Sequence, residues 1–126
     1  MSKKHHVLVV EDDELGFQLV KQILRKMPLE FTHASNGAAA IACLEQEIPE
    51  LILLDLTLPD MRGWDVLDRF KNDARLQKSH VIVLTGHDNP VHRLIGSLKE
   101  IAVYMNKPFK AEDLRQQVRT LLNLDA

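Results

Sequence analysis

The sequence predicts an α/β fold, in which five helices cover a five-stranded, doubly wound parallel sheet. Strand-like and helix-like segments alternate strictly along the 126 residues, without an internal repeat, a low-complexity tract or a linker rich in Pro, Gly and Ser. The apolar run 51–54 shows no polar alternation, which is typical of a central strand covered on both faces. Five βα units of this size imply right-handed crossovers, and the first and third strands should be neighbours.

The first half of the chain supplies three strands and two helices. Residues 6–10 form a short β-branched run, residues 31–34 a weaker strand, and residues 51–54 the central one. Between the strands, apolar residues recur at helical spacing and each stripe ends near a proline. The stripes consist of Leu19, Val20, Ile23, Leu24 and Met27 before Pro28, and of Ile41, Leu44 and Ile48 before Pro49.

The second half adds two strands and three helices. The strands are expected at residues 80–84 and 101–105. Asn89 followed by Pro90 is typical of a helix cap with proline at the first helical position. The three helical stripes are Val66, Leu67 and Phe70; Val91, Leu94, Ile95 and Leu98; and Leu114, Val118, Leu121 and Leu122.

Length and composition are those of one ordinary globular domain. We expect residues 1–126 to form it, with a core over about residues 5–124. A formal charge of −2 argues against a general nucleic-acid binder. No apolar stretch approaches the roughly 20 residues that cross a bilayer, and the start of the chain lacks the apolar region of a signal peptide. A single cysteine, Cys43, in a helical pattern favours a buried thiol and a cytoplasmic protein without membrane insertion.

Residues with phosphoryl-transfer chemistry stand where four of the predicted strands end. They are Glu11 and Asp12 after the first strand, Asp55 after the third, Thr85 after the fourth and Lys107 after the fifth. Ligands of open α/β sheets bind outside the carboxyl ends of the strands. The sequence therefore predicts that these five side chains share one crevice.

Three carboxylates in one crevice require a cation. Two carboxylates about 5 Å apart repel by roughly 3 kcal/mol at an effective dielectric of about 20, and one ammonium cannot neutralise three acids. Mg²⁺ takes oxygen ligands and commonly joins one or two carboxylates to a substrate phosphate. Glu11 and Asp12 would hold the metal, and Asp55 would be the nucleophile. Lys107 and Thr85 would donate hydrogen bonds to the transferring oxygens.

In these motifs the chain resembles the receiver domain of two-component response regulators, over nearly its whole length. The matching segments are Val9–Asp13, Leu53–Gly63, Leu84–Gly86 and Tyr104–Phe109. The resemblance implies a flavodoxin-like receiver fold with strand order 2-1-3-4-5. It also implies a phosphorelay switch, not an enzyme in the ordinary sense. Asp55 would accept phosphate from a sensor histidine kinase, a phosphotransfer protein or a small phosphodonor, and would lose it slowly.

The resemblance assigns the metal ligands and the aim of the lysine. Glu11, Asp12 and Asp55 would bind Mg²⁺, for which Mn²⁺ can substitute, and the backbone carbonyl of Thr57 would be a further ligand. The bond Lys107–Pro108 would be the cis peptide of the family, which proline makes possible and which would aim the lysine into the crevice.

The resemblance also implies a switch. Thr85 would move to bond the phosphoryl oxygens, and Tyr104 would turn from solvent toward the core. A downstream protein, and not nucleic acid, would then bind the face formed by the fourth helix, fifth strand and fifth helix. Thr57 and His87, two residues beyond Asp55 and Thr85, would tune the lifetime of the acyl phosphate.

The same residues also have to be compared with other interpretations of the chain. Asp13 is best explained as the cap of the first helix. A flavin protein of the same fold would need a phosphate loop rich in Gly and hydroxyl groups after the first strand. A haloacid-dehalogenase-like phosphatase would need a second aspartate where Thr57 stands. An interaction-only pseudo-receiver, and a receiver segment of a hybrid histidine kinase, both stay open.

Overall fold

Five parallel strands form one sheet in the order β2-β1-β3-β4-β5 within the part of the chain that the structure describes, residues 4–86, 90–98, 101 and 103–124. In this computed structural model the strands are β1 (His5–Val10), β2 (Leu29–Ala34), β3 (Leu51–Asp55), β4 (His80–Thr85) and β5 (Val103–Asn106). Strand β1 pairs in parallel with β2 on one side and with β3 on the other. The fold class and the strand order expected from the sequence are confirmed.

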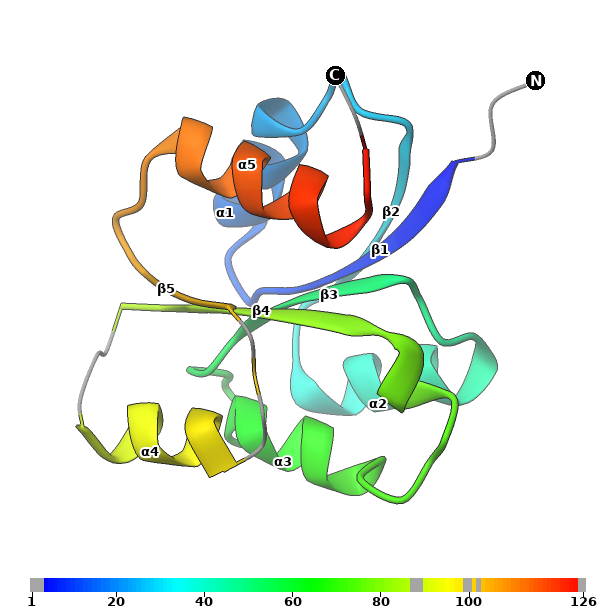
Figure 1. Cartoon of the computed structure of the whole chain (residues 1–126). Coiled ribbons are helices and arrows are strands. Elements are labelled where there is room, and N and C mark those ends of the chain that lie inside the picture. The colour runs from blue at the N-terminus through cyan, green and yellow to red at the C-terminus, as the bar shows by residue number, and fades with distance from the viewer. Residues whose placement is uncertain (1–3, 87–89, 99–100, 102, 125–126) are drawn as a thin grey trace.

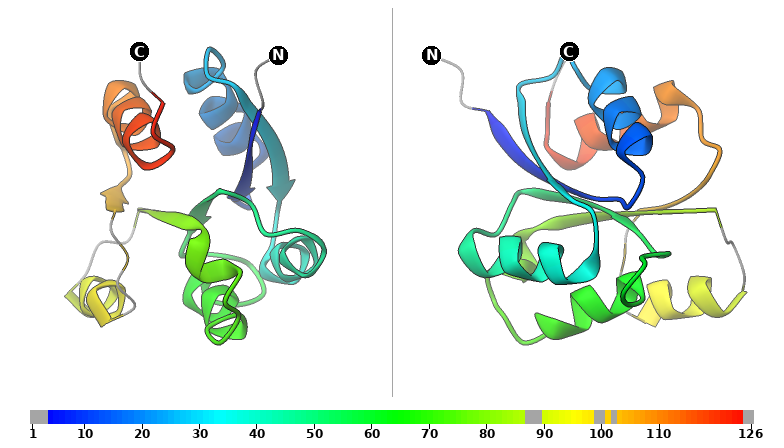
Figure 2. Two further views of the ribbon diagram at one scale, coloured as in Figure 1. Left: turned by 45° about the vertical axis from the view of Figure 1, so that its right-hand side comes forward. Right: turned by 180° about the vertical axis from the view of Figure 1, so that it is seen from behind.

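Helices cover both faces of the sheet (Figure 1, Figure 2). They are α1 (Glu14–Ile23), α2 (Gly37–Gln46), α3 (Gly63–Arg69), α4 (Pro90–Leu98) and α5 (Ala111–Leu121), with a short 3-10 helix, η1 (Leu76–Lys78). Helices α1 and α5 lie on one face, and α2, α3 and α4 lie on the other (Figure 1). Pro90 begins α4 as expected, whereas the expected cap residue Asn89 lies outside the described residues.

The sheet divides the core into two layers. All five residues of β3 are buried, which confirms that the apolar run is a central strand. Successive strand residues face opposite sides of a sheet, so each strand contributes to both layers. The layer under α1 and α5 includes Val7, Val9, Leu51, Leu53, Leu114 and Val118, and the other includes Leu8, Val10, Ile52, Leu54, Trp64 and Val66.

Helix α1 begins as expected and ends earlier than expected. Asp13 is its N-cap, and its Oδ1 accepts a hydrogen bond from the N–H of Leu15 at 3.0 Å. The helix ends at Ile23, because the chain then turns: the N–H of Met27 donates to the carbonyl of Leu24 at 3.1 Å. Met27 therefore packs against the core from a turn and not from the helical stripe.

The starts of two strands differ from the expectation by two residues, and the other strand boundaries by at most one. Strand β2 begins at Leu29, two residues early, because it pairs with the start of β1 in a register that places Leu29 opposite His5. Strand β5 begins at Val103, two residues late. The N–H of Ile101 donates to the carbonyl of Gly96 in α4, at 2.9 Å, and is thus bonded to that helix and not to the neighbouring strand.

Candidate functional site

Three carboxylates meet at the carboxyl ends of β1 and β3. Val10 lies opposite Leu54 in the paired strands, so the residues that follow them are brought together. Glu11, Asp12 and Asp55 each place one carboxylate oxygen within 4.8 Å of the other two. Glu11 and Asp55 are both 7% exposed, whereas Asp12 is exposed. The cluster is therefore buried on its inner side and open to solvent at Asp12.

Lys107 reaches this cluster from the end of β5. Its Nζ donates to Glu11 Oε2 at 2.7 Å and to Asp55 Oδ2 at 2.8 Å. The peptide bond Lys107–Pro108 is cis. The N–H of Lys107 donates to the carbonyl of Thr85 at 2.7 Å, which ties the segment after β5 to the last residue of β4. The structure thus brings together the acids and the lysine that the sequence singled out.

The electrostatics of the site follow from one ammonium facing three carboxylates. Burial raises the pKa of Glu11 above its ordinary value, although the hydrogen bond and the charge of Lys107 act in the opposite direction. Burial would lower the pKa of Lys107, but its hydrogen bonds to Asp55 and Glu11 and their negative charges outweigh it and raise this pKa. Two negative charges remain uncompensated when all four groups are ionised.

The donor set fits a hard divalent cation. Carboxylate oxygens at this spacing are the ligands that Mg²⁺ prefers, and Mg²⁺ would supply the missing positive charge. Exposed Asp12 gives an ion access from solvent. Gly16 leaves space for the carboxylate of Glu11, because a Cβ at that position would lie 3.1 Å from Glu11 Cδ. Glu11, Asp12 and Asp55 are thus the residues that could hold the metal.

The loop after β3 holds Asp55 from its other side. The N–H of Thr57 donates to Asp55 Oδ1 at 2.8 Å, so both carboxylate oxygens of Asp55 have a hydrogen-bond donor. Gly63 packs directly on this loop: its N–H donates to the carbonyl of Leu56 at 2.9 Å. A Cβ at Gly63 would lie 2.6 Å from the carbonyl oxygen of Asp55, so this approach requires glycine.

Thr85 and Tyr104 lie on the β4 and β5 side of the site. Thr85 is fully buried at the end of β4. Tyr104 is half-buried in β5, and its hydroxyl oxygen is buried. The guanidinium of Arg93 lies 5.1 Å from the centre of the tyrosine ring, and a Cβ at Gly96 would lie 3.6 Å from that ring. Tyr104 therefore packs against α4. His87 lies outside the described residues.

Trp64, the first residue after Gly63, connects α3 with α4. Its side chain is almost completely buried, and its Nε1–H donates to Nδ1 of His92 in α4 at 3.1 Å. A Cβ at Gly96 would also lie 3.6 Å from the indole, so Trp64 and Tyr104 approach the same position of α4. The loop that follows Asp55 is thus linked through α3 to the helix that covers β5.

Sequence reasoning missed two residues at this edge of the sheet. The Nε2–H of His33, in β2, donates to the backbone carbonyl of Glu11 at 2.6 Å. Asp60 accepts the N–H groups of Gly37 and Ala38 at 2.8 and 3.0 Å, and these bonds lower its pKa. The position of His33 near the carboxyl end of a strand was the available signal, because that edge carries the other site residues.

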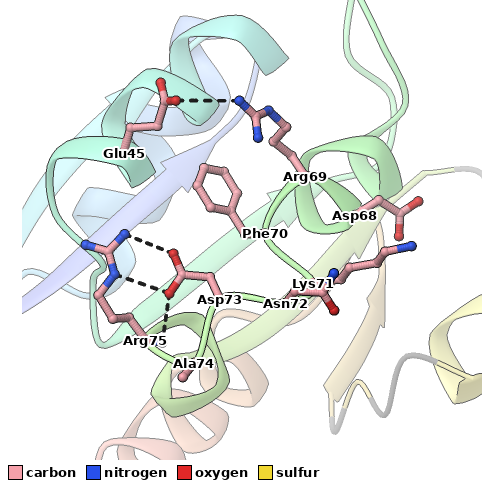
Figure 3. A pocket seen from close by; sticks show the side chains of 9 residues that line it. All are labelled: Glu45, Asp68, Arg69, Phe70, Lys71, Asn72, Asp73, Ala74 and Arg75. Carbon is pink, nitrogen blue, oxygen red and sulfur yellow. Dashed lines mark hydrogen bonds and ion pairs between the residues drawn. The ribbon is translucent and has the colours of Figure 1, made fainter.

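The pocket in Figure 3 lies away from this site, where α3 leads toward the start of β4. It is a hollow of about 690 Å³, with Phe70 in its lining. Arg69 pairs with Glu45 at 3.7 Å, and Arg75 pairs with Asp73 at 2.9 Å (Figure 3). Both arginines of the hollow thus pair with carboxylates that also line it.

Sheet, helices and acidic edge together define a receiver. The chain belongs to the response regulator receiver domain family, whose model matches residues 7–119. Receiver domains are signalling switches of two-component systems, interact with histidine kinases and downstream effectors, and generally bind Mg²⁺. Among the described residues, no helix has the length and apolar character needed to span a membrane.

Proteins with a segment similar to this chain include a transcriptional regulator and a histidine kinase, both of which are longer. The chain is 34% identical to "Probable transcriptional regulatory protein TcrX" of Mycobacterium tuberculosis, over 92% of this chain and 49% of that protein. It is 27% identical to histidine kinase P4 of Formosa agariphila, over 95% of this chain and 9% of the kinase. It thus spans about half or less of these relatives. A CheY-like receiver domain protein from Methanospirillum hungatei superposes with a TM-score of 0.86 at 28% identity, over 97% of this chain and 95% of that chain.

Proposed function

We propose that this chain is a cytoplasmic receiver domain that accepts phosphate. Its Asp55 would take a phosphoryl group from a sensor histidine kinase or a phosphotransfer protein. One observation carries the proposal: Lys107 bridges Glu11 and Asp55 at 2.7 and 2.8 Å beside three convergent carboxylates. An ion pair that served only stability would not need a third, exposed acid at the same place. Phosphoryl transfer needs a nucleophile, a cation site and a donor in this arrangement.

The residues would divide the chemistry between them. An oxygen of Asp55 attacks the phosphorus, the bond from phosphorus to the donor imidazole breaks, and its electron pair stays on the imidazole. Thr57 N–H and Lys107 Nζ hold the carboxylate for this attack, and Lys107 then donates to a transferred oxygen. Bound Mg²⁺, held by Glu11, Asp12 and Asp55, would neutralise the charge of the transferring group. We propose the backbone carbonyl of Thr57 as a further ligand and Mn²⁺ as a substitute ion.

The switch would start at Thr85 and end at α4. Phosphorylation adds up to two negative charges and three acceptor oxygens, toward which the buried hydroxyl of Thr85 would turn. Tyr104 already lies against α4, so its inward position would be stabilised and not newly created. In Thr85→Ala, Asp55 should still be phosphorylated, but the change in fluorescence of Trp64 should be reduced. An undiminished change would contradict this coupling.

The output would be read by a protein at the face of α4, β5 and α5. Helix α4 carries three exposed apolar side chains, those of Val91, Leu94 and Leu98. Thr57 is exposed beside Asp55, and we propose that it and His87 tune the lifetime of the acyl phosphate by controlling how water reaches it.

A second candidate is the receiver segment of a hybrid histidine kinase. The match to histidine kinase P4 favours it, because 95% of this chain aligns with only 9% of that kinase. The chemistry at Asp55 would be the same, and the donor would be a histidine of the same polypeptide or of a phosphotransfer protein.

The decisive experiment is phosphorylation with acetyl phosphate, followed by intact-protein mass spectrometry. We expect one added phosphoryl group in the presence of Mg²⁺ and none after the metal is chelated. Asp55→Asn, treated in the same way, should gain none. A chain that is not modified in Mg²⁺ would be an interaction-only pseudo-receiver, and equal labelling of Asp55→Asn would place the acceptor elsewhere.

A further inference from the structure

The backbone of Glu11 is bonded to strand β2 on both sides of the residue. Its N–H donates to the carbonyl of Ala34 at 3.0 Å. Its carbonyl accepts the Nε2–H of His33 at 2.6 Å. A carbonyl oxygen can only accept, so the imidazole must carry a proton on Nε2. Glu11 is thus held by the last two residues of β2, just beyond the point where β1 ends at Val10.

The ring of His33 is itself held firmly. It stacks on the ring of Phe17 in α1, with centroids 4.1 Å apart and planes inclined by 10°. Phe17 belongs to the buried core. The Nδ1 of His33 lies 3.4 Å from Oε2 of Glu14, and the side chain is 17% exposed. An imidazole fixed by a core residue can fix the orientation of the peptide group that it contacts.

The carbonyl that His33 holds belongs to the peptide joining the first two candidate metal ligands. Fixing that carbonyl fixes the plane of the peptide between Glu11 and Asp12, which restricts the directions in which the two side chains can leave the backbone. The carboxylate of Glu11 is then aligned further by the N–H of Asp13 at 3.2 Å and by Lys107 at 2.7 Å.

We propose that His33 is a positioning residue for the divalent cation: its hydrogen bond to the Glu11 carbonyl sets the direction of the Glu11 and Asp12 carboxylates. The inference rests on the proposed function, because it assumes that these carboxylates bind Mg²⁺. Partners that orient metal ligands typically change metal affinity by 10- to 100-fold when they are removed. Here the contact is to the backbone of a ligand, so we expect the lower end of that range.

The test compares two replacements of His33 in the full chain. His33→Phe keeps a ring for stacking on Phe17 and loses the donor, whereas His33→Gln keeps an N–H donor. Isothermal titration calorimetry with Mg²⁺ should show binding weakened by roughly 10-fold in His33→Phe and largely restored in His33→Gln. His80→Phe, at an exposed histidine at the start of β4, is the matched control and should bind as the wild type does.

Thermal unfolding, as a further readout, separates a loss of metal affinity from a loss of stability. Without Mg²⁺, His33→Phe should unfold at a midpoint no lower than that of His33→Gln, which loses the stack on Phe17. A loss of Mg²⁺ affinity confined to His33→Phe would then not come from lost stability, as a purely structural role of the ring would require. Unchanged Mg²⁺ affinity in His33→Phe would overturn the inference, as would equal losses in His33→Phe and His33→Gln. A wild-type chain that binds no Mg²⁺ would instead overturn the proposed function itself.

Discussion

The site has two sides whose described contacts differ. The acidic side lies at the ends of β1 and β3, and the switch side is formed by β4, α4 and β5. On the acidic side, short hydrogen bonds fix both the backbone and the side chains. Glu11 is bonded through its N–H and its carbonyl to β2 at 3.0 and 2.6 Å. Asp55 has a donor on each carboxylate oxygen, at 2.8 Å from Thr57 and 2.8 Å from Lys107.

On the switch side, the contacts among the described residues include close packing of two rings against α4. Arg93 lies 5.1 Å above the ring of Tyr104, and a Cβ at Gly96 would only touch the rings of Tyr104 and Trp64 at 3.6 Å. A hydrogen bond from Trp64 Nε1–H to His92 Nδ1, at 3.1 Å, also joins α3 to α4. The contrast suits a switch. Catalytic groups must be held within about 0.5 Å of their working geometry, whereas an element that moves must be displaced at low cost.

The largest difference in stability is expected between alanine replacements of Gly63, beside the acidic side, and of Gly86, which follows β4. In Gly63→Ala the new Cβ would meet the backbone oxygen of Asp55 at 2.6 Å and Leu56 Cα at 2.8 Å. Backbone cannot rotate away as a side chain can, so we expect the free energy of unfolding to fall by about 3 kcal/mol. Urea unfolding measures this. Gly86→Ala, where a Cβ would meet no atom of the described residues within 4 Å, should be nearly neutral, and equal effects of the two replacements would contradict this contrast.

Removing the lysine charge tests how strongly the acidic side depends on a cation. Without Mg²⁺, Lys107→Met should lower the free energy of unfolding by about 2 kcal/mol, less than for a fully buried pair because the Lys107 side chain is 31% exposed. Saturating Mg²⁺ should reduce the difference, since a divalent cation also compensates the acids. Urea unfolding with and without Mg²⁺ measures both. Lys71→Met, at an exposed lysine, should behave as the wild type does, and a loss unaffected by Mg²⁺ would contradict the shared role.

The acidic side could be predicted from sequence because each of its groups follows a recognisable strand. Asp55 and Lys107 are 52 residues apart, yet parallel strands bring their carboxyl ends to one edge whatever the separation. The same reasoning predicted that the first and third strands are neighbours and that β3 is buried, whereas the full strand order came from the family resemblance. Local sequence patterns were therefore enough to predict contacts between distant segments where the parallel sheet brings the strand ends together.

The contacts that were missed follow no such rule. Trp64 and His92 are 28 residues apart, and Asp60 caps a helix that begins 23 residues before it. Each contact depends on how one helix or loop packs on another, which hydrophobic spacing does not specify. The late start of β5 has a similar cause, because Ile101 is bonded to α4.

On the switch side, Gly96→Ala should have the opposite sign to Gly63→Ala. A Cβ at Gly96 would make ordinary van der Waals contacts at 3.6 Å with Trp64 and Tyr104. Alanine is favoured over glycine inside a helix by about 1 kcal/mol, so we expect stability to rise by up to this amount. Chemical unfolding measures it. A clear loss would show that α4 is packed as tightly as the acidic side, and the comparison between the two sides would fail.

The smallest effect expected is a pH dependence on the acidic side. Burial raises the pKa of Glu11 above its ordinary value of 4.5, against the opposing influence of Lys107. Above pH 4.5 the folded chain therefore holds this proton longer than the unfolded chain, and the free energy of unfolding falls as pH rises through that window. Glu11→Gln lacks this contribution, so the stability of the wild type relative to Glu11→Gln should decline from pH 4.5 upward when both are unfolded in urea with Mg²⁺ chelated. A relative stability that rises instead would mean that attraction to Lys107 outweighs burial, and that the acidic side is stabilised by its charges even before a metal binds.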